Sequence, residues 1–100
     1  MKSSANEALV DRFSAADTAV EVGVGHRPEV AGELAATGTR VVATDIEPRP
    51  VPAGVTFVID DVTDPDLAVY QAASLVYALR APPELHRAIR SVARSVDAAA

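Results

Sequence analysis

Cysteine is absent from the 100 residues, which excludes disulfides, thiolate nucleophiles and cysteine-based metal sites. Long apolar runs are missing as well. The longest, such as Val41–Ala43 and Leu75–Leu79, span only a few residues, whereas a membrane-spanning helix needs about 20. The start of the chain also lacks the basic segment and apolar stretch of a secretory signal. These absences predict a cytoplasmic protein with no membrane partner.

Lysine and aromatic residues are scarce. Lysine occurs once, at Lys2, and four residues are aromatic, whereas 20 are alanine and 15 are valine. Nine basic against fourteen acidic residues give a formal charge of −5, which argues against nucleic acid as a partner because the phosphate backbone repels an acidic surface. This profile is typical of proteins from salt-loving archaea, and a bacterium of high GC content is the alternative source. The length allows a single domain, residues 1–100.

The hydrophobic pattern alternates between strand-like and helix-like segments. A short amphipathic helix is predicted near the start, where Leu9, Val10 and Phe13 have helical spacing. Four strands are predicted at Thr18–Val22, Arg40–Asp45, Val55–Ile59 and Ser74–Leu79. Helices are predicted from Pro28 to Gly38, near Leu67–Tyr70 and from about Pro83 to Val96.

Such alternation predicts an α/β protein whose strands are parallel, because parallel neighbours need long crossover connections and helices then cover both faces. We expect the strand order 3-2-1-4, a minimal Rossmann-like sheet. Strands one and four are neighbours in this order, and the chain winds away from them in opposite directions. The crevice at their carboxyl ends is therefore the predicted ligand site.

Two glycines and three acids are expected at that crevice. Glu21, Gly23 and Gly25 lie where the first strand turns into a helix, and glycine there permits a tight turn and a close ligand approach. Asp45 follows 20 residues after Gly25 at the end of strand two, where a carboxylate can accept hydrogen bonds from both ribose hydroxyls. Asp61 follows strand three. The pattern predicts a site for a nucleoside-type small molecule, although tight turns and strand ends alone could explain the same residues.

Dinucleotides are disfavoured at this loop. The third glycine of a dinucleotide fingerprint would fall at Arg27 or Pro28, so a pyrophosphate would meet a crowded turn. The Arg27 guanidinium could instead bind a carboxylate or phosphate. His26 could act as an acid or base toward a ligand, but a solvated loop histidine explains it as well. No metal is expected, because no pair of ligands has helical spacing.

Several segments resemble known proteins. Val20–Gly25, Ala43–Asp45 and Phe57–Asp64 resemble the first half of an S-adenosylmethionine-dependent methyltransferase. More narrowly, Leu75–His86 and three other stretches are similar to the small uncharacterised archaeal family UPF0146, which is methyltransferase-like in fold. The other three are Val20–Val30, Thr44–Pro50 and Asp60–Leu67. The resemblance extends from about residue 8 to residue 96.

The resemblance implies S-adenosylmethionine as a cofactor and roles for five residues. Glu21, Gly23 and Gly25 would line the loop at the methionine end, Asp45 would hold the ribose, and Asp61 would accept from the adenine amino group. The segment Arg80–Pro83 lacks the Asn/Asp-Pro-Pro-aromatic run with which amino-group methyltransferases hold a nitrogen. The last strands of a full methyltransferase are also absent. Two functions therefore stay open: a minimal or degenerate methyltransferase, and an interaction domain that keeps the fold without the ligand.

Two surface features complete the sequence-based expectations. Arg87, Arg90 and Arg94 form a stripe on one face of the last helix. Such a stripe is usually a solvated face near the negative end of the helix dipole, and contact with RNA or another acidic surface is the alternative. Strand four is expected to be an unprotected edge of the sheet. Pairing of two such edges would give a homodimer.

Overall fold

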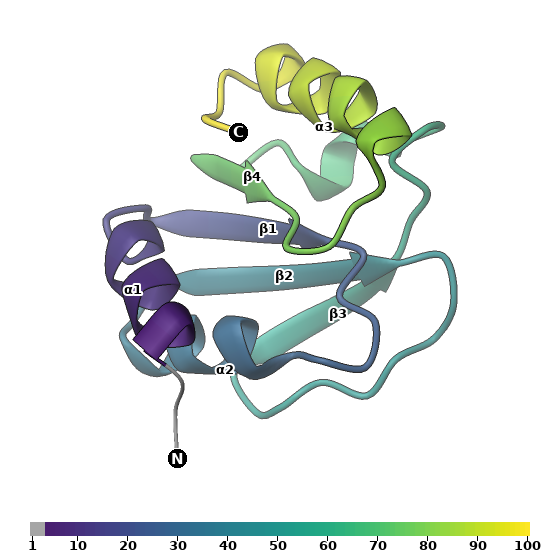
Figure 1. Cartoon of the computed structure of the whole chain (residues 1–100). Helices are drawn as coiled ribbons and strands as arrows, with labels where there is room; N and C mark the ends of the chain where they lie inside the picture. The colour runs from purple at the N-terminus through teal and green to yellow at the C-terminus, as the bar shows by residue number, and fades with distance from the viewer. Residues whose placement is uncertain (1–3) are drawn as a thin grey trace.

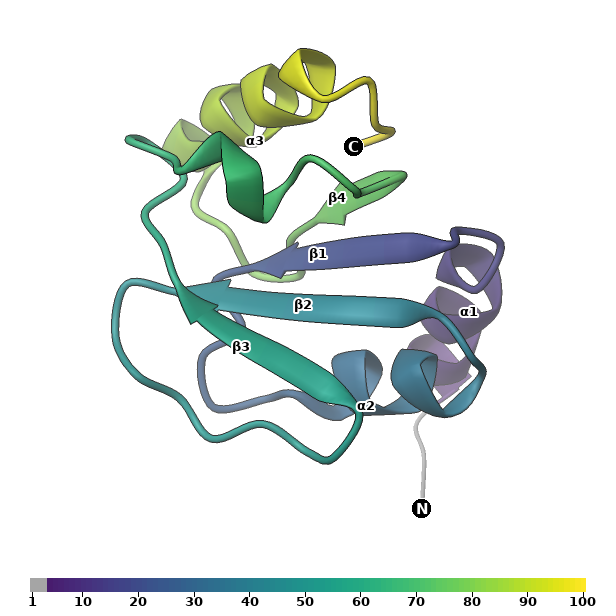
Figure 2. The same ribbon diagram turned by 180° about the vertical axis from the view of Figure 1, so that it is seen from behind.

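The computed structural model describes residues 4–100, which form a parallel sheet with helices on both sides (Figures 1 and 2). The elements follow the chain as α1 Ser4–Phe13, β1 Thr18–Val22, α2 Glu29–Ala36, β2 Arg40–Asp45, β3 Val55–Ile59, η1 Leu67–Val69, β4 Leu75–Tyr77 and α3 Pro83–Ser95. None of the helices in this part of the chain is long and apolar enough to cross a membrane.

The strand order is β3-β2-β1-β4, and all three neighbouring pairs are parallel. This confirms the predicted order 3-2-1-4. In the register, Glu21 of β1 lies between Ala43 of β2 and Tyr77 of β4. Asp45, the last residue of β2, lies beside Ile59, the last residue of β3. The strand ends that carry the predicted site residues therefore meet at one edge of the sheet.

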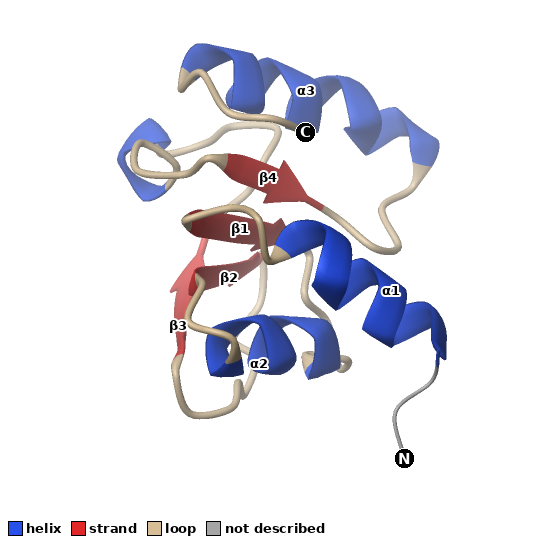
Figure 3. Ribbon diagram, turned by 90° about the vertical axis from the view of Figure 1, so that its left-hand side faces the viewer, coloured by secondary structure: helices blue, strands red, loops and turns tan. Residues whose placement is uncertain are grey.

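Each face of the sheet has its own apolar core. The helices α1 and α2 cover one face (Figure 3), where Leu34 packs with the strand residues Ala19 and Val41. The helix α3 and the segment around η1 cover the other face, where Tyr70 and Val76 pack with Val92. Because both faces are covered, β1 is buried at every residue, as a central parallel strand must be.

The helices predicted from Pro28 to Gly38 and from Pro83 to Val96 are slightly shorter in the structure, as α2 and α3, and two other elements differ more. The fourth strand comprises only Leu75–Tyr77, because the chain after it turns toward Pro82 and Pro83, where α3 begins. The helix near Leu67–Tyr70 is a single 3₁₀ turn, Leu67–Val69. It is capped by the Asp66 carboxylate, which accepts from the Ala68 N–H at 3.1 Å.

The edge of β4 is partly paired, whereas the sequence predicted an unprotected edge. Ala99 returns beside Leu75 as a parallel bridge. The Val76 N–H donates to the Ala99 carbonyl at 2.8 Å, and the Ala99 N–H donates to the Ser74 carbonyl at 3.0 Å. At one end of this edge, the backbone groups of Ser74 and Val76 are therefore already hydrogen-bonded within the chain.

Candidate functional site

Two hollows open at the carboxyl ends of the strands, one on each side of the end of β1. The first, here the Asp45 hollow, has a volume of ≈ 260 Å³ and is lined by Val22, Gly23, Asp45, Ile46, Asp60, Asp61, Val62, Arg80, Ala81, Pro82 and Leu85. The second, here the Glu21 hollow, has a volume of ≈ 720 Å³ and is lined by Asn6, Leu9, Phe13, Glu21, Gly23, Val24, Arg27, Glu29, Val30, Ala78, Leu79 and Arg80. Gly23 and Arg80 line both hollows, so the two meet over the turn that follows β1.

The turn after β1 depends on glycine because of its backbone conformation. Gly23 has φ of +69° and Gly25 has φ of +58°, values that other residues rarely adopt. A Cβ at Gly23 would meet nothing within 4 Å, so the space above this residue is open. The open space above this turn leaves room for another molecule to approach the backbone of Gly23.

Asp45 fixes this turn to the end of β2. Its Oδ2 accepts from the Gly25 N–H at 2.9 Å and lies 3.5 Å from Nε of Arg49. Its Oδ1 accepts from the Glu47 N–H at 3.2 Å. Burial disfavours the charged carboxylate, but the bonds from Gly25 and Glu47 and the charge of Arg49 outweigh it and lower the pKa of Asp45. The spacing of 20 residues between Gly25 and Asp45 thus corresponds to a direct hydrogen bond.

Asp61 has a different environment at the end of β3. It is exposed, and its Oδ1 accepts from the hydroxyl of Thr63 at 2.6 Å and from the Thr63 N–H at 2.9 Å. These two bonds lower the pKa of Asp61. Both bonds go to one oxygen, and the residue lines the Asp45 hollow. Its carboxylate is ionised and accessible to a donor that enters the hollow.

Glu21 lies in the other hollow, against Tyr77. Its side chain is 2% exposed, and its Oε1 accepts from the Tyr77 hydroxyl at 2.8 Å. Burial raises the pKa of Glu21 to about 7, although the bond from Tyr77 opposes the shift, and the nearby charge of Glu29 adds to it. Tyr77 itself packs against Phe13 with ring centroids 4.5 Å apart. A buried acid that titrates near neutrality in a hollow is a recognised sign of a functional site.

Four of the five predicted residues line the two hollows. Gly23, Asp45 and Asp61 line one hollow, and Glu21 joins Gly23 in the other. Gly25 lines neither of these hollows and holds Asp45 through its N–H.

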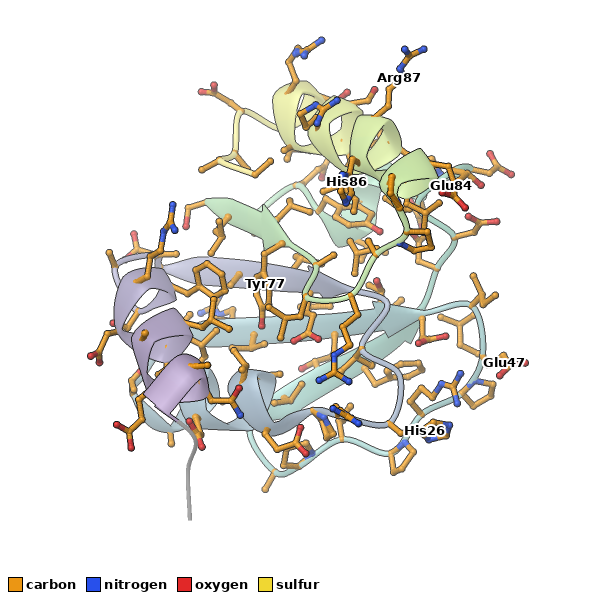
Figure 4. All side chains as sticks on the ribbon, viewed as in Figure 1. His26, Glu47, Tyr77, Glu84, His86 and Arg87 are labelled. Carbon is orange, nitrogen blue, oxygen red and sulfur yellow. The ribbon has the colours of Figure 1, made fainter. Side chains whose placement is uncertain are left out.

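His26 and Arg49 connect the glycine turn with the loop after β2. Nη1 of Arg49 lies 2.9 Å from Nε2 of His26, and Nη2 of Arg49 donates to Oε2 of Glu47 at 3.1 Å. His26 and Glu47 are labelled at the outer side of these loops in Figure 4, away from Tyr77. Within residues 4–100, no group of three or more histidine and carboxylate side chains is arranged to hold a metal ion.

Sequence reasoning missed two contributions to the hollows. Ile46 directly follows Asp45 and is 69% exposed in the Asp45 hollow. A large apolar residue in the polar, proline-rich stretch after β2 is not expected to pack in the core. This feature of the sequence could have identified Ile46 as a candidate ligand contact. Arg80 lines both hollows, but its sequence neighbours Pro82 and Pro83 suggested only a break in the chain. Its position depends on where β4 ends, which the sequence placed two residues too late.

The strand order and the crevice between β1 and β4 define a doubly wound α/β protein of the Rossmann type. The sequence profile of the uncharacterised protein family UPF0146 matches residues 5–100. The chain is 62% identical over 80 residues to the UPF0146 protein of Halobacterium salinarum strain R1, covering 80% of this chain and 62% of that protein. It is 52% identical over 79 residues to the UPF0146 protein of Archaeoglobus fulgidus, which covers 79% of this chain and 61% of that protein. It is 32% identical over 81 residues to the UPF0146 protein of Pyrococcus horikoshii, which covers 77% of this chain and 62% of that protein. The chain therefore belongs to UPF0146, and the matched part is 62% of the length of the Halobacterium relative.

Proposed function

We propose that this protein binds S-adenosylmethionine or a related nucleoside across the two hollows, as a minimal or degenerate methyltransferase. The observation that carries the proposal is that the Asp45 and Glu21 hollows meet over Gly23, at the switch point of the sheet. Ligand sites in such proteins usually have volumes of about 300–1,000 Å³. The smaller hollow alone is near the lower limit, and the two together fit a nucleoside with a further polar group.

The Asp45 hollow has the chemistry to hold the base and the ribose. The exposed side chain of Ile46 offers an apolar surface to one face of a ring and would lose its contact with water on binding. The free oxygen of Asp61 would accept from an exocyclic amino group. Asp45 has four lone-pair positions, of which the loop uses up to three, so one remains for a ribose hydroxyl.

The Glu21 hollow would take the remainder of the ligand. It combines the acids Glu21 and Glu29 with the cations Arg27 and Arg80. An amino-acid group carries both an ammonium and a carboxylate, so it requires this mixture of charges. A ligand ammonium beside Glu21 would favour the ionised carboxylate and would bring the pKa of Glu21 down from about 7. Binding would therefore release a proton near neutral pH.

The alternative is an interaction domain that keeps the fold without a ligand. The observation that favours it is the engagement of Asp45, whose two oxygens already accept from Gly25 and Glu47 within the chain. In this case the acid has a structural role and fixes the turn.

Thermal unfolding with S-adenosylmethionine, S-adenosylhomocysteine and NAD separates the two functions. A ligand at one hundred times its dissociation constant adds about 2.7 kcal/mol of stability, which in a chain of this size raises the melting temperature by roughly 10–20 °C. We expect the two adenosyl amino acids to give this shift and NAD to give none. If none of the three compounds raises the melting temperature, the protein is an interaction domain that does not bind them.

Asp61→Asn tests the site without disturbing the fold, because Asp61 is exposed and its carboxylate accepts from Thr63 through one oxygen that an asparagine keeps. We expect about tenfold weaker binding of S-adenosylhomocysteine in titration calorimetry, the effect of one lost hydrogen bond to a charged group. Asp64→Asn is the matched control, because Asp64 is exposed in the same segment and does not line the hollow. Equal weakening in both variants would contradict the proposed site. Transfer of a labelled methyl group to components of a cell extract then tests for catalysis.

The composition and one relative support the proposal that this protein comes from a salt-loving archaeon. The chain has one lysine and a formal charge of −5, and its relative at 62% identity comes from Halobacterium salinarum. Surface carboxylates of this kind keep a chain hydrated when salt screens other charges.

A further inference from the structure

Arg49 connects the two loops that meet beside the Asp45 hollow, and its guanidinium has three partners. Nη1 lies 2.9 Å from Nε2 of His26, in the glycine turn after β1. Nη2 donates to Oε2 of Glu47 at 3.1 Å, and Nε lies 3.5 Å from Oδ2 of Asp45. The side chain of Arg49 is 19% exposed, so most of it is enclosed between the loops. It lines neither hollow of the proposed site and can therefore act on a ligand only through these partners.

The loop after β2 depends on these contacts because its own backbone is poorly bonded. Every second residue from 48 to 52 is proline, which has no N–H to donate. In the part of the chain that the structure describes, residues 46–51 form no hydrogen bond between backbone groups. Their hydrogen bonds run through the side chains of Asp45 and Arg49 instead. Since few bonds hold this segment, the loss of one of them is enough to release Ile46 from its place in the hollow.

The contact between Arg49 and His26 requires a neutral imidazole. Arginine has only N–H donors, so Nε2 of His26 is the acceptor and the proton of the neutral ring lies on Nδ1. A protonated histidine has a donor on each nitrogen and no acceptor. It would also bring a second positive charge against the guanidinium. The contact is therefore lost when His26 binds a proton.

Other charges near His26 would draw a protonated ring away from the loop after β2. Arg27 follows His26 in the glycine turn, and Glu47 reaches it only through Arg49. Glu29, the first residue of α2, lines a shallow hollow of ≈ 480 Å³ together with His26. The two arginines repel a protonated ring, whereas the carboxylate of Glu29 attracts it. Protonation thus moves the ring toward α2 and separates the glycine turn from Arg49.

We propose that Arg49 is a positioning residue of the nucleoside site, and that it holds Ile46 and Asp45 in place only while His26 is neutral. This role rests on the proposed function and adds to it a loss of affinity at acid pH. Arg49 itself does not touch the ligand. Through Glu47 it keeps Ile46 against one face of the base, and it holds the Asp45 carboxylate toward the ribose. Protonation of His26 disconnects the two loops, and the site opens.

The connection between the loops can be measured without a ligand. Histidine changes charge between about pH 5 and 8, and we expect the Glu47 amide and the Ile46 methyl signals to follow the titration of His26 in nuclear magnetic resonance spectra. In Arg49→Met both signals should stay constant, because the guanidinium that joins the loops is missing. His86→Gln replaces the other histidine of the chain, on α3, and should leave the response unchanged. Signals that do not follow His26 in the natural chain overturn the proposal.

Adenosine is the probe for the site, because it has no amino-acid group that would respond to the titration of Glu21. Its affinity is measured from the shifts of the Ile46 methyl signals. We expect the natural chain to bind it about threefold more weakly at about pH 5.5 than at about pH 7.5, the effect of one exposed hydrogen bond. His26→Gln keeps an acceptor that does not titrate, so its affinity should be equal at both pH values. Arg49→Met should bind about tenfold more weakly than the natural chain at the higher pH.

Arg49→Lys separates the charge of this residue from its shape. A lysine ammonium keeps the charge beside Asp45 but lacks the planar fork that reaches three partners, so most of the loss should remain. Full affinity in either Arg49 variant, or equal affinity of the natural chain at the two pH values, overturns the positioning role and leaves the nucleoside site intact. If the natural chain binds neither adenosine nor S-adenosylhomocysteine at either pH, the proposed function fails, and the positioning role fails with it.

Discussion

Two tyrosine–carboxylate pairs lie on opposite faces of the sheet, and they share one chemistry. On the α1 face, the Tyr77 hydroxyl donates to Oε1 of Glu21 at 2.8 Å. On the α3 face, the Tyr70 hydroxyl donates to Oδ2 of Asp60 at 2.6 Å. Burial raises the pKa of both tyrosines, and the carboxylate beside each adds to the shift. Each tyrosine is therefore a permanent donor at ordinary pH.

The acids differ in their surroundings. Asp60 lies beyond the end of β3, half-buried, and its Oδ1 also accepts from the Asp66 N–H at 2.9 Å. Glu21 lies inside β1, where burial raises its pKa to about 7. Asp60 thus acts as a structural acceptor that organises the turn before η1, whereas Glu21 can change its charge near neutral pH. The pKa of Glu21 is raised because its carboxyl group is enclosed, and the hydrogen bond from Tyr77 opposes the shift.

The largest difference between the pairs is expected in the pH dependence of stability. Because the pKa of Glu21 is about 7 in the folded protein and 4.5 as its ordinary value, the folded chain binds more protons than the unfolded chain between these limits. Stability therefore falls as pH rises through this window, by up to about 3 kcal/mol. Glu21→Gln cannot ionise, so urea unfolding of this variant should lack this loss and should show higher stability than the natural chain at pH 8.

Glu7→Gln is the control for this experiment, because Glu7 is an exposed residue of α1. It should keep the full decline in stability between pH 4.5 and 7. If the natural chain shows no decline in this window, Glu21 is not the enclosed acid that the geometry describes.

Removal of the two hydroxyls compares the pairs directly. Tyr77→Phe leaves a buried, ionised Glu21 without its donor at pH 8 and should cost about 2 kcal/mol. Tyr70→Phe leaves Asp60 with the Asp66 N–H and with access to water, so a loss of about 1 kcal/mol is expected. The free energy of unfolding in urea measures both values. Equal losses would show that enclosure does not distinguish the two acids.

The sheet could be predicted from the sequence because each strand has a strong local signal. Apolar β-branched runs identify buried strands, and the connections between them dictate parallel neighbours. The adjacency of Gly25 and Asp45 was also predictable, since the fold brings the ends of β1 and β2 together. The end of β4 could not be predicted, because Ala78 and Leu79 continue the apolar run of the sequence although the strand has already ended at Tyr77.

The tyrosine pairs were not predictable, because they depend on register. Glu21 meets Tyr77 only because the two residues are partners across β1 and β4, 56 positions apart in the chain. Tyr70 meets Asp60 only after a short 3₁₀ turn. One signal did exist in the sequence: Glu21 is an acid between valines in a strand that is otherwise buried, and such a charge requires a partner.

The smallest expected effect concerns Phe13, whose ring packs on the tyrosine of the Glu21–Tyr77 pair. Phe13 packs on Tyr77 at a ring-centroid distance of 4.5 Å and an interplanar angle of 34°, and it also lines the Glu21 hollow. Phe13→Leu should cost about 1 kcal/mol through the lost ring contact. It should also let water approach Glu21, so the upper limit of the stability decline should move from about pH 7 to a lower pH. Phe57→Leu, a change on β3 outside both hollows, is the control. If it moves the upper limit equally, water does not reach Glu21 through the position of Phe13.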